Sequence, residues 1–145
     1  MELAIRELTG PDLGADFLET LASLAEVDLG RDTALAVFRE RLRAGIRTFV
    51  AVLDRRIVGT LTLFVEQKFI HHGGKVGHIE DVVVEKSFQR KGIGQALVLH
   101  ATAEARKLGC YKVILCCFED RVPFYEGVGF RRHDVGMRID LNPLE

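Results

Sequence analysis

The chain has 145 residues, of which 48% are hydrophobic and 28% charged, and its formal net charge is −1. This composition is typical of a soluble globular protein, and the length suits one domain that buries about 70% of its unfolded surface. A near-neutral charge argues against a general nucleic-acid binder. No apolar run approaches the ~20 residues of a membrane span, and the first residues lack the apolar core of a signal peptide. We expect a cytoplasmic protein with a single domain over residues 1–145 and with neither a nucleic-acid nor a membrane partner.

The first half of the chain predicts strands and two helices. A short strand is expected at residues 3–8, and two β-rich runs at 48–53 and 57–65 flank a predicted hairpin turn at Asp54-Arg55-Arg56. Asp32 or Thr33 is positioned to cap the second helix. The apolar residues expected on one face of the two helices are Leu13, Phe17, Leu21 and Leu24, then Leu35, Phe38 and Leu42.

The second half predicts a polar loop at 67–75, a strand at 76–84 and a long helix that ends at Gly109. A strand at 111–117, a short helix at 122–128 and a final strand at 130–141 follow. The apolar face of the long helix comprises Ile93, Leu97, Ala101, Ala105 and Leu108. The final strand alternates, with Val135, Met137, Ile139 and Leu141 on one face. This order suits a mixed sheet with helices on both faces.

Three cysteines leave at least one thiol unpaired, which indicates a reducing compartment. Cys116 and Cys117 are neighbours on a predicted strand, so their side chains are expected to face opposite ways. Zinc needs about four converging ligands, and neither a Cys-x-x-Cys nor a His-x-x-x-His spacing occurs. We therefore expect no metal site.

Residues 81–95 are the most informative segment. Three valines predict a buried strand, and the basic turn that follows carries Gly92 and Gly94 before the long helix. The first amides of a helix have no intrahelical acceptor, and the helix dipole favours an anion there. Lys91 precedes the glycines, unlike a P-loop, and a dinucleotide turn would need a third glycine. The segment predicts a pyrophosphate cradle, with an ordinary solvated turn as the alternative.

The turn Gln89-Arg90-Lys91-Gly92-Ile93-Gly94 resembles the acyl-coenzyme A signature of the GNAT acetyltransferase superfamily. Segments 66–71, 77–84 and 109–115, with Phe124-Tyr125 and Gly129-Phe130, are similar to the glucosamine-6-phosphate N-acetyltransferase family within it. The similarity spans about residues 57–139. It implies an α/β (α+β) fold with a central mixed, mostly antiparallel sheet flanked by helices. It also implies a homodimer that acetylates glucosamine 6-phosphate with acetyl-CoA, a step of UDP-N-acetylglucosamine biosynthesis, in a direct ternary complex.

The resemblance also implies roles for individual residues. Glu80 is expected to receive the amine proton, and Tyr125 to support the leaving thiolate. Adjacent strand side chains face opposite ways, so Glu80 and Asp81 both reach a substrate only if the strand bulges. The implied coenzyme contacts are Val82, Val83, Val84, Gln89, Arg90, Lys91, Gly92, Ile93, Gly94, Gln95, Arg121 and Tyr125. The implied sugar contacts are Lys68, Phe69, Ile70, His71, Glu80, Asp81, Val82, Ala101, Thr102, Cys116 and Arg138.

Several positions depart from the pattern of that family. The family commonly has Thr at the position of Ala25 and Asp at that of Cys116. It commonly has Asn at the position of Arg121 and Arg at that of Asp140. Glu119 or Asp120 is an alternative base in place of the missing Asp, and Arg138 an alternative cation. Each functional role also has a structural alternative. Glu80 and Asp81 form a solvated acidic pair, Tyr125 packs in the core, and Lys68 is a solvated loop residue. Two other functions remain open, namely acetylation of another small amine and a non-catalytic acyl-CoA-binding module.

Overall fold

A computed structural model describes residues 2–142 of the chain. It forms two compact units, one up to Leu115 and one from Cys116 onward, and each is described by itself below. The expectation of a single domain over residues 1–145 stays a prediction.

The first unit is built on a five-stranded sheet. Its strands are β1 (Leu3–Glu7), β2 (Ile46–Leu53), β3 (Arg56–Gln67), β4 (Lys75–Val84) and β5 (Cys110–Ile114), and they lie side by side in chain order. The first four pair antiparallel, whereas β4 and β5 are parallel. The predicted mixed, mostly antiparallel sheet is confirmed.

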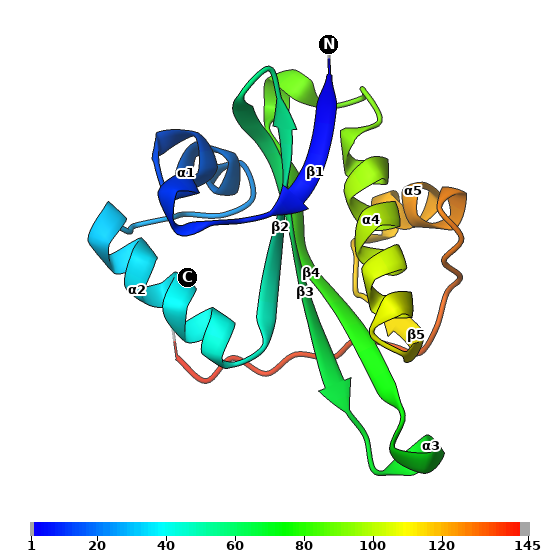
Figure 1. Ribbon diagram of the computed structural model, residues 1–145. Helices are drawn as coiled ribbons and strands as arrows, with labels where there is room; N and C mark the ends of the chain where they lie inside the picture. Colours follow the sequence, from blue (N-terminus) through cyan, green and yellow to red (C-terminus); the bar gives the residue numbers. More distant parts are fainter. Residues whose placement is uncertain (1, 143–145) are drawn as a thin grey trace. The chain divides into compact units, whose positions relative to one another are not determined.

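Helices cover both faces of this sheet. α1 (Ala15–Ala22) and α2 (Arg31–Arg43) lie on one side and α4 (Ile93–Lys107) on the other, while β3 and β4 extend as a long hairpin with α3 (Ile70–Gly73) at its tip (Figure 1). Short 3-10 turns occur at Gly10–Asp12 and Lys86–Phe88. α4 is the crossover that parallel pairing of β4 and β5 requires.

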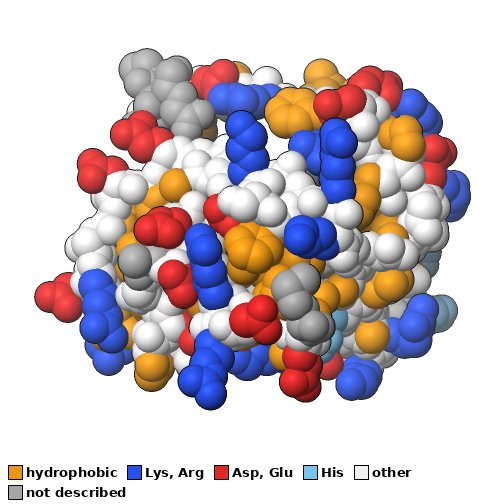
Figure 2. Space-filling view, turned by 90° about the horizontal axis from the view of Figure 1, so that it is seen from above, with side chains coloured by type: hydrophobic (Ala, Val, Ile, Leu, Met, Phe, Trp, Pro, Cys, Tyr) orange, Lys and Arg blue, Asp and Glu red, His pale blue; other side chains and the backbone are white. Residues whose placement is uncertain are grey.

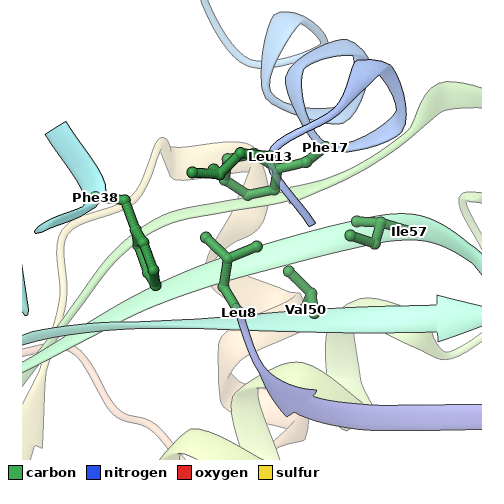
Figure 3. Packing of buried hydrophobic residues seen from close by; sticks show 6 residues of the cluster. All are labelled: Leu8, Leu13, Phe17, Phe38, Val50 and Ile57. Carbon is green, nitrogen blue, oxygen red and sulfur yellow. The ribbon is translucent and has the colours of Figure 1, made fainter. Parts of the chain in front are cut away.

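The hydrophobic core on the α1 and α2 side is formed by residues from both helices, from β2 and from β3. Figure 3 shows six of these side chains pointing toward one another from their separate elements: Leu8, Leu13, Phe17, Phe38, Val50 and Ile57. On the other face, the side of α4 with Ile93, Leu97, Ala101 and Ala105 is buried as predicted. Burial of apolar side chains on both faces is the main stabilising contribution.

Three leucines expected in helix cores are exposed instead. Leu24 is 48% exposed because α1 ends two residues earlier, and Leu108 is 37% exposed because it is the C-cap of α4. Leu42, in the last turn of α2, is 46% exposed. The predicted cap of α2 was also wrong, because Gly30 is the N-cap and Asp32 lies inside the first turn. A carboxylate there still interacts favourably with the helix dipole.

The turn between β2 and β3 confirms the predicted hairpin. Leu53 pairs with Arg56, so the loop has two residues, and Asp54 and Arg55 adopt left-handed conformations with φ of 49° and 68°. Two consecutive residues with positive φ are typical of the type I′ turn, whose twist matches that of the strands. Gly109 also has a positive φ, 85°, as expected after the C-cap of α4.

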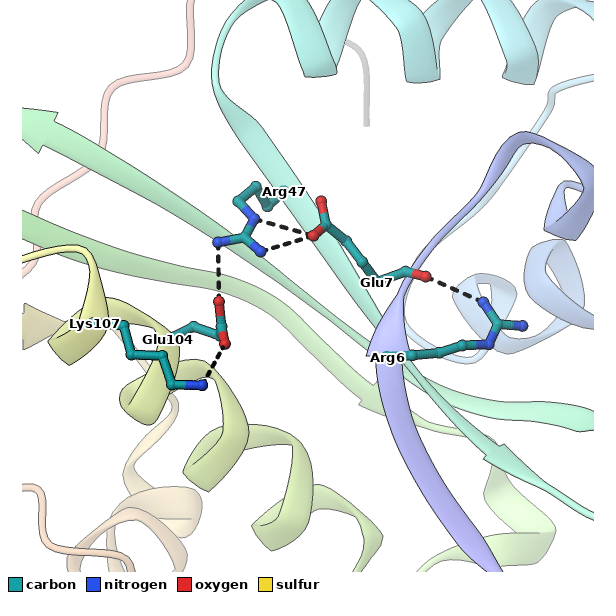
Figure 4. Close-up of polar contacts among 5 residues, drawn as sticks. All are labelled: Arg6, Glu7, Arg47, Glu104 and Lys107. Carbon is teal, nitrogen blue, oxygen red and sulfur yellow. Dashed lines mark hydrogen bonds and ion pairs between the residues drawn. The ribbon is translucent and has the colours of Figure 1, made fainter.

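An ion-pair network joins three elements of the first unit. Arg47 on β2 donates hydrogen bonds to Glu7 on β1 at 2.7 Å and to Glu104 on α4 at 3.2 Å (Figure 4). Lys107 adds a second contact to Glu104 at 3.4 Å, and the Arg47 guanidinium lies 5.1 Å from the centroid of Phe49. Partly exposed pairs of this kind stabilise only modestly, so we take the network to fix orientation.

Asp12 is the most strongly perturbed acid of the fold. Arg6 donates to both of its oxygens at 2.7 and 2.9 Å, and the backbone N–H and hydroxyl of Thr9 donate at 2.7 and 2.8 Å. The hydrogen bonds from Arg6 lower the pKa of Asp12 from 3.8 to about 2. Burial acts in the opposite direction, and the hydrogen bonds from Thr9 add to the decrease. A carboxylate so held contributes to stability only while it is ionised.

We expect Asp12→Asn to lower the free energy of unfolding by about 2 kcal/mol at pH 7. The folded pKa lies below the unfolded one, so the contribution is complete above about pH 5 and is lost as pH falls toward 2. Urea unfolding of both proteins at pH 7 and pH 3 measures this difference. Equal stability at pH 7, or a difference that does not shrink at pH 3, would contradict the assignment.

The second unit contains a 3-10 turn at Glu119–Arg121 and α5 (Val122–Gly127), which confirms the predicted short helix. The predicted final strand at 130–141 was wrong for the single chain, because no strand is present between 128 and 142. The four alternating apolar side chains of this segment are exposed to solvent by 82–94%: Val135, Met137, Ile139 and Leu141. A strand needs a hydrogen-bonding neighbour.

The strand predicted at 111–117 ends earlier than expected, at Ile114. Cys116 and Cys117 therefore lie in the segment after β5, both exposed. The expectation that they face opposite sides of a strand was wrong.

On the surface, Lys and Arg side chains are interspersed with Asp and Glu on the face that Figure 2 presents, in keeping with the net charge.

Candidate active site

The edge of β4 is open along its second half. β4 pairs with β5 only from Lys75, opposite Cys110, to His78, opposite Ile114. Within the described residues, positions 79–84 of β4 have a neighbouring strand on the β3 side alone. The unpaired side of such a strand can accept an extended ligand through backbone hydrogen bonds.

A β-bulge lies at the centre of this open segment. Thr60 pairs with Val83 and Thr62 with Glu80, so two residues of β4, Asp81 and Val82, lie opposite one of β3. Asp81 has a φ of 50°, in the left-handed region. A bulge re-aims side chains at functional sites. The condition for Glu80 and Asp81 to serve one ligand is therefore met, and both side chains are exposed.

A polar row continues along β3 and β4 toward the hairpin tip. His78 packs flat on Phe64, with ring centroids 4.5 Å apart, and its Nε2 lies 3.0 Å from Glu66. Lys68 pairs with the other oxygen of Glu66 at 3.2 Å. Hydrogen bonds from His78 and then Lys68 lower the pKa of Glu66. The charge of Lys68, an expected phosphate contact, is thus partly compensated within the chain.

The hairpin tip presents two apolar side chains and a fixed histidine. Phe69 is completely exposed and Ile70 is 61% exposed. His71 adopts a left-handed conformation, and its ring lies 4.6 Å from that of Tyr111. A Cβ at Gly74 would lie 2.7 Å from the Tyr111 ring, so this close approach requires glycine. The predicted polar loop contains the short segment α3, in which His71 and His72 depart from helical φ and ψ.

The predicted cradle has the backbone that anion binding requires. Gly92 is the N-cap of α4 with a φ of 80°, and the first backbone bond of the helix runs from Ala96 to the Gly92 carbonyl at 3.0 Å. The amides of Ile93, Gly94 and Gln95 precede that bond, so they lack intrahelical acceptors. The exposed side chains of Arg90 and Lys91 lie just before them in the chain. This end of a 15-residue helix favours a phosphate.

The loop that leads into the cradle is braced by side chains. The Gln89 amide donates to the Val84 carbonyl at 3.0 Å, so it holds the loop to the end of β4. Arg56, from the start of β3, lies over the Phe88 ring at 5.3 Å and 3.8 Å from Glu85. Sequence reasoning missed Arg56 and Phe88, because their contact joins segments about 30 residues apart and no local motif signals it.

On α4, the two expected sugar contacts differ in access. Ala101 is fully buried, whereas Thr102 is half-buried and its hydroxyl donates to the Val98 carbonyl at 2.8 Å. A Cβ at Gly59 on β3 would approach Leu97 within 3.0 Å, so the helix packs tightly on the sheet. Thr102 is therefore the better placed of the pair for contact with a ligand.

In the second unit, Tyr125 packs edge-on against Phe124 and Phe130, with centroids 4.9 and 5.8 Å apart. Burial raises the pKa of the Tyr125 phenol, Cys117 adds to the increase, and Arg121 opposes it. The phenol therefore remains protonated at neutral pH and is suited to donate a hydrogen bond.

Other expected site residues of this unit are engaged with one another. Glu119 accepts two hydrogen bonds from Arg132, at 3.0 and 2.7 Å, which weakens its case as an alternative base. Arg138 donates to Asp140 at 2.7 Å. The Cys116 thiol lies 3.3 Å from where a Cβ at Gly136 would stand.

The rest of the described chain adds no second candidate site. No three His, Cys, Asp or Glu side chains between residues 2 and 142 are placed to share a metal ion. None of the helices described is both long and apolar enough for a membrane crossing. A surface hollow of about 310 Å³ is lined by Arg6, Asp12, Arg55 and Ile57 among others, and contains none of the expected site residues.

The chain is similar to known acetyltransferases. It is 43% identical over 144 residues to a glucosamine 6-phosphate N-acetyltransferase of Trypanosoma brucei brucei, covering 97% of each protein. A crystal structure of a Trypanosoma brucei acetyltransferase matches 97% of this chain and 100% of its own with a TM-score of 0.91. The glucosamine-6-phosphate N-acetyltransferase structure of Arabidopsis thaliana is 29% identical, covers 98% of this chain and 100% of its own, and has a TM-score of 0.90. A sequence model of the acetyltransferase (GNAT) family matches residues 14–130, and the chain belongs to that family.

Proposed function

We propose that this protein transfers the acetyl group of acetyl-CoA to the 2-amino group of glucosamine 6-phosphate, giving N-acetylglucosamine 6-phosphate and CoA. The observation that carries the proposal is the bulged Glu80-Asp81 segment on the open edge of β4. It occurs in a chain that matches a glucosamine 6-phosphate N-acetyltransferase over nearly its full length. Acetylation of another small amine is the second candidate, favoured by the departures at Cys116 and Asp140.

The coenzyme site follows from the cradle and the open strand edge. The free amides at the start of α4, with Arg90 and Lys91, suit a pyrophosphate. The open edge of β4 at Val82, Val83 and Val84 suits the pantetheine arm, which has amide groups of its own to pair. Gln89 contributes by bracing the loop, since its side chain is bound to Val84.

The chemistry needs an unprotonated amine, support for the carbonyl oxygen and support for the thiolate. Glu80 accepts a proton from the substrate ammonium, directly or through water, and the neutral amine then attacks the thioester carbonyl. A backbone amide of Val82 or Val83 donates to the carbonyl oxygen as it gains charge. The C–N bond forms, the C–S bond breaks, and Tyr125 gives a proton or hydrogen bond to the departing sulfur, for which a raised phenol pKa is suitable. The second proton that the nitrogen loses replaces the one given to sulfur, so the products are the amide and the free thiol of CoA.

Recognition of the sugar would combine several elements. Asp81 would bind ring hydroxyls, and Thr102 and His71 would add contacts. Lys68 and Arg138 are the cations expected at the phosphate. We also propose a cytoplasmic homodimer in which residues 135–141 form a strand with a second copy, because their apolar face is exposed in the single chain.

A comparison of amine substrates tests the proposed function. We expect kcat/KM for glucosamine 6-phosphate to exceed that for glucosamine by about 100-fold or more, because a buried dianion gains charge-assisted hydrogen bonds. Amino acids and polyamines, assayed at the same acetyl-CoA concentration, should be poorer still. Comparable efficiency with glucosamine would defeat the sugar-phosphate assignment, and a preferred amino acid or polyamine would establish the second candidate.

A further inference from the structure

Arg41, on the last turns of α2, is a cation that the expected site did not include. Its guanidinium is half-buried, and its Nη2 donates to the hydroxyls of Thr62 at 2.7 Å and Thr48 at 3.1 Å. Both threonines are buried, 8% and 5% exposed. Two neutral hydroxyls hold this side chain against the sheet, and they do so from strands β3 and β2.

Strand pairing brings Arg41 to the row that contains Glu80. Thr48 lies directly opposite Thr62, and Thr62 lies directly opposite Glu80. Paired residues of antiparallel strands share one face, with Cβ atoms about 4.5–5.5 Å apart. Arg41, Thr62 and Glu80 therefore occupy the same face of the sheet, and a ligand the size of a sugar that touches Glu80 lies within reach of the guanidinium.

Among the described residues, Arg41 has no ion-pair partner. Within residues 2–142, no carboxylate oxygen lies within the 4.0 Å of an ion pair with Arg41. Burial lowers the pKa of the guanidinium, and the Asp81 carboxylate offsets this only in part. A partly buried cation without a counter-ion is costly unless a ligand supplies the negative charge.

The other cations near this face are already engaged. Lys68 is paired with Glu66 at 3.2 Å, and Arg43, two residues along α2, is paired with Glu40 at 2.6 Å on the surface. Two of the five guanidinium donors of Arg41, both on Nη2, are used by the threonines, so Nε and Nη1 remain as separate donors for an anion. Each of these donors can give a charge-assisted hydrogen bond to a phosphate oxygen.

We propose that Arg41 binds the phosphate of the sugar substrate and sets the preference for a phosphorylated amino sugar. The assignment rests on the proposed function and deepens it, because it adds to Lys68 and Arg138 a cation that recognises the phosphate. Thr48 and Thr62 act as positioning residues, since they hold the guanidinium on the face of Glu80. The phosphate would then compensate the Arg41 charge, while the amine lies toward Glu80.

The test uses Arg41→Met and Arg41→Lys, with Arg43→Met as the control on the same helix. For Arg41→Met, we expect kcat/KM with glucosamine 6-phosphate to fall about 30- to 100-fold, mainly through KM, and kcat/KM with glucosamine to stay within about twofold. Arg41→Lys should retain part of the preference, because it keeps the charge without the separate Nε and Nη1 donors. Arg43→Met should match the parent with both substrates.

Equal losses with both sugars would overturn the proposal, because they would show that Arg41 only supports Asp81 or the strand.

A binding measurement separates this result from failure of the proposed function. Calorimetric titration with glucose 6-phosphate, which has no amine to acetylate, should show binding to the parent and Arg43→Met proteins and at least tenfold weaker binding to Arg41→Met. If the parent acetylates neither sugar yet shows this pattern, the anion site stands and the acetylation assignment fails. Absence of binding to the parent, or equal binding to Arg41→Met, would overturn the role of Arg41.

Discussion

Replacement of Glu80 by glutamine is expected to lower turnover with glucosamine 6-phosphate by about 10²- to 10⁴-fold, the usual contribution of a positioned general base. The carboxamide keeps the size of the side chain and cannot accept the ammonium proton. Glu80 is exposed next to the bulge, so the substitution leaves no buried cavity. Steady-state kinetics at saturating acetyl-CoA, from pH 6 to pH 9, measures the effect.

The pH dependence identifies the cause of this loss. As pH rises, more of the substrate amine is unprotonated without assistance, so the deficit of Glu80→Gln should shrink. Tyr125→Phe is the comparison variant: its turnover should also fall, but affinity for acetyl-CoA should hold, because the lost contact is made mainly in the transition state. Glu40→Gln, on the surface of α2, is the matched control and should behave as the parent. Turnover of Glu80→Gln within about twofold of the parent would mean that the proton leaves by another route.

Local patterns predicted most of the fold, because the residue types that favour strands and helices follow one another along the sequence. The β-rich runs predicted for β2, β3 and β4 are strands in the structure, and the helical spacing from Ile93 to Ala105 marks the buried side of α4. The connection from β4 to α4 through Gly92 was predicted for the same reason, whereas its role as a pyrophosphate cradle stays a prediction. Element ends were less accurate: Gly30 caps α2, and Leu24 lies past the end of α1. Capping depends on which of several suitable residues the tertiary packing selects.

Contacts between distant segments could not be predicted. The left-handed Asp81 arises from the register of β4 against β3, and Asp tolerates that conformation without a sequence signal. Arg41 reaches Thr48 and Thr62 only when α2 packs on β2 and β3. In the sequence it is one of several basic residues at the end of a helix. Side chains whose role depends on register or on helix packing are therefore the ones that a sequence alone leaves out.

The tail of the chain is the place where a correct pattern gave a wrong element. Val135, Met137, Ile139 and Leu141 alternate as in a strand, yet all four are at least 82% exposed and no neighbouring strand pairs with them in the described chain. Full burial of four such side chains is worth about 6–12 kcal/mol before the cost of association. A second copy of the chain would supply both the hydrogen-bonding edge and the apolar cover.

We therefore expect a chain that ends at residue 134 to be monomeric and to lose at least about 100-fold in kcat/KM with glucosamine 6-phosphate, if the neighbouring tail completes the sugar site. Met137→Lys with Ile139→Lys should have the same effect without shortening the chain, because two charges on the apolar face oppose its burial. Leu24→Lys, at an apolar side chain exposed on the first unit, is the control and should leave both properties unchanged. Light scattering at the assay concentration gives the oligomeric state beside the activity. A parent protein that is monomeric and fully active would refute the dimer, and an active, dimeric double-lysine variant would remove this tail from the interface.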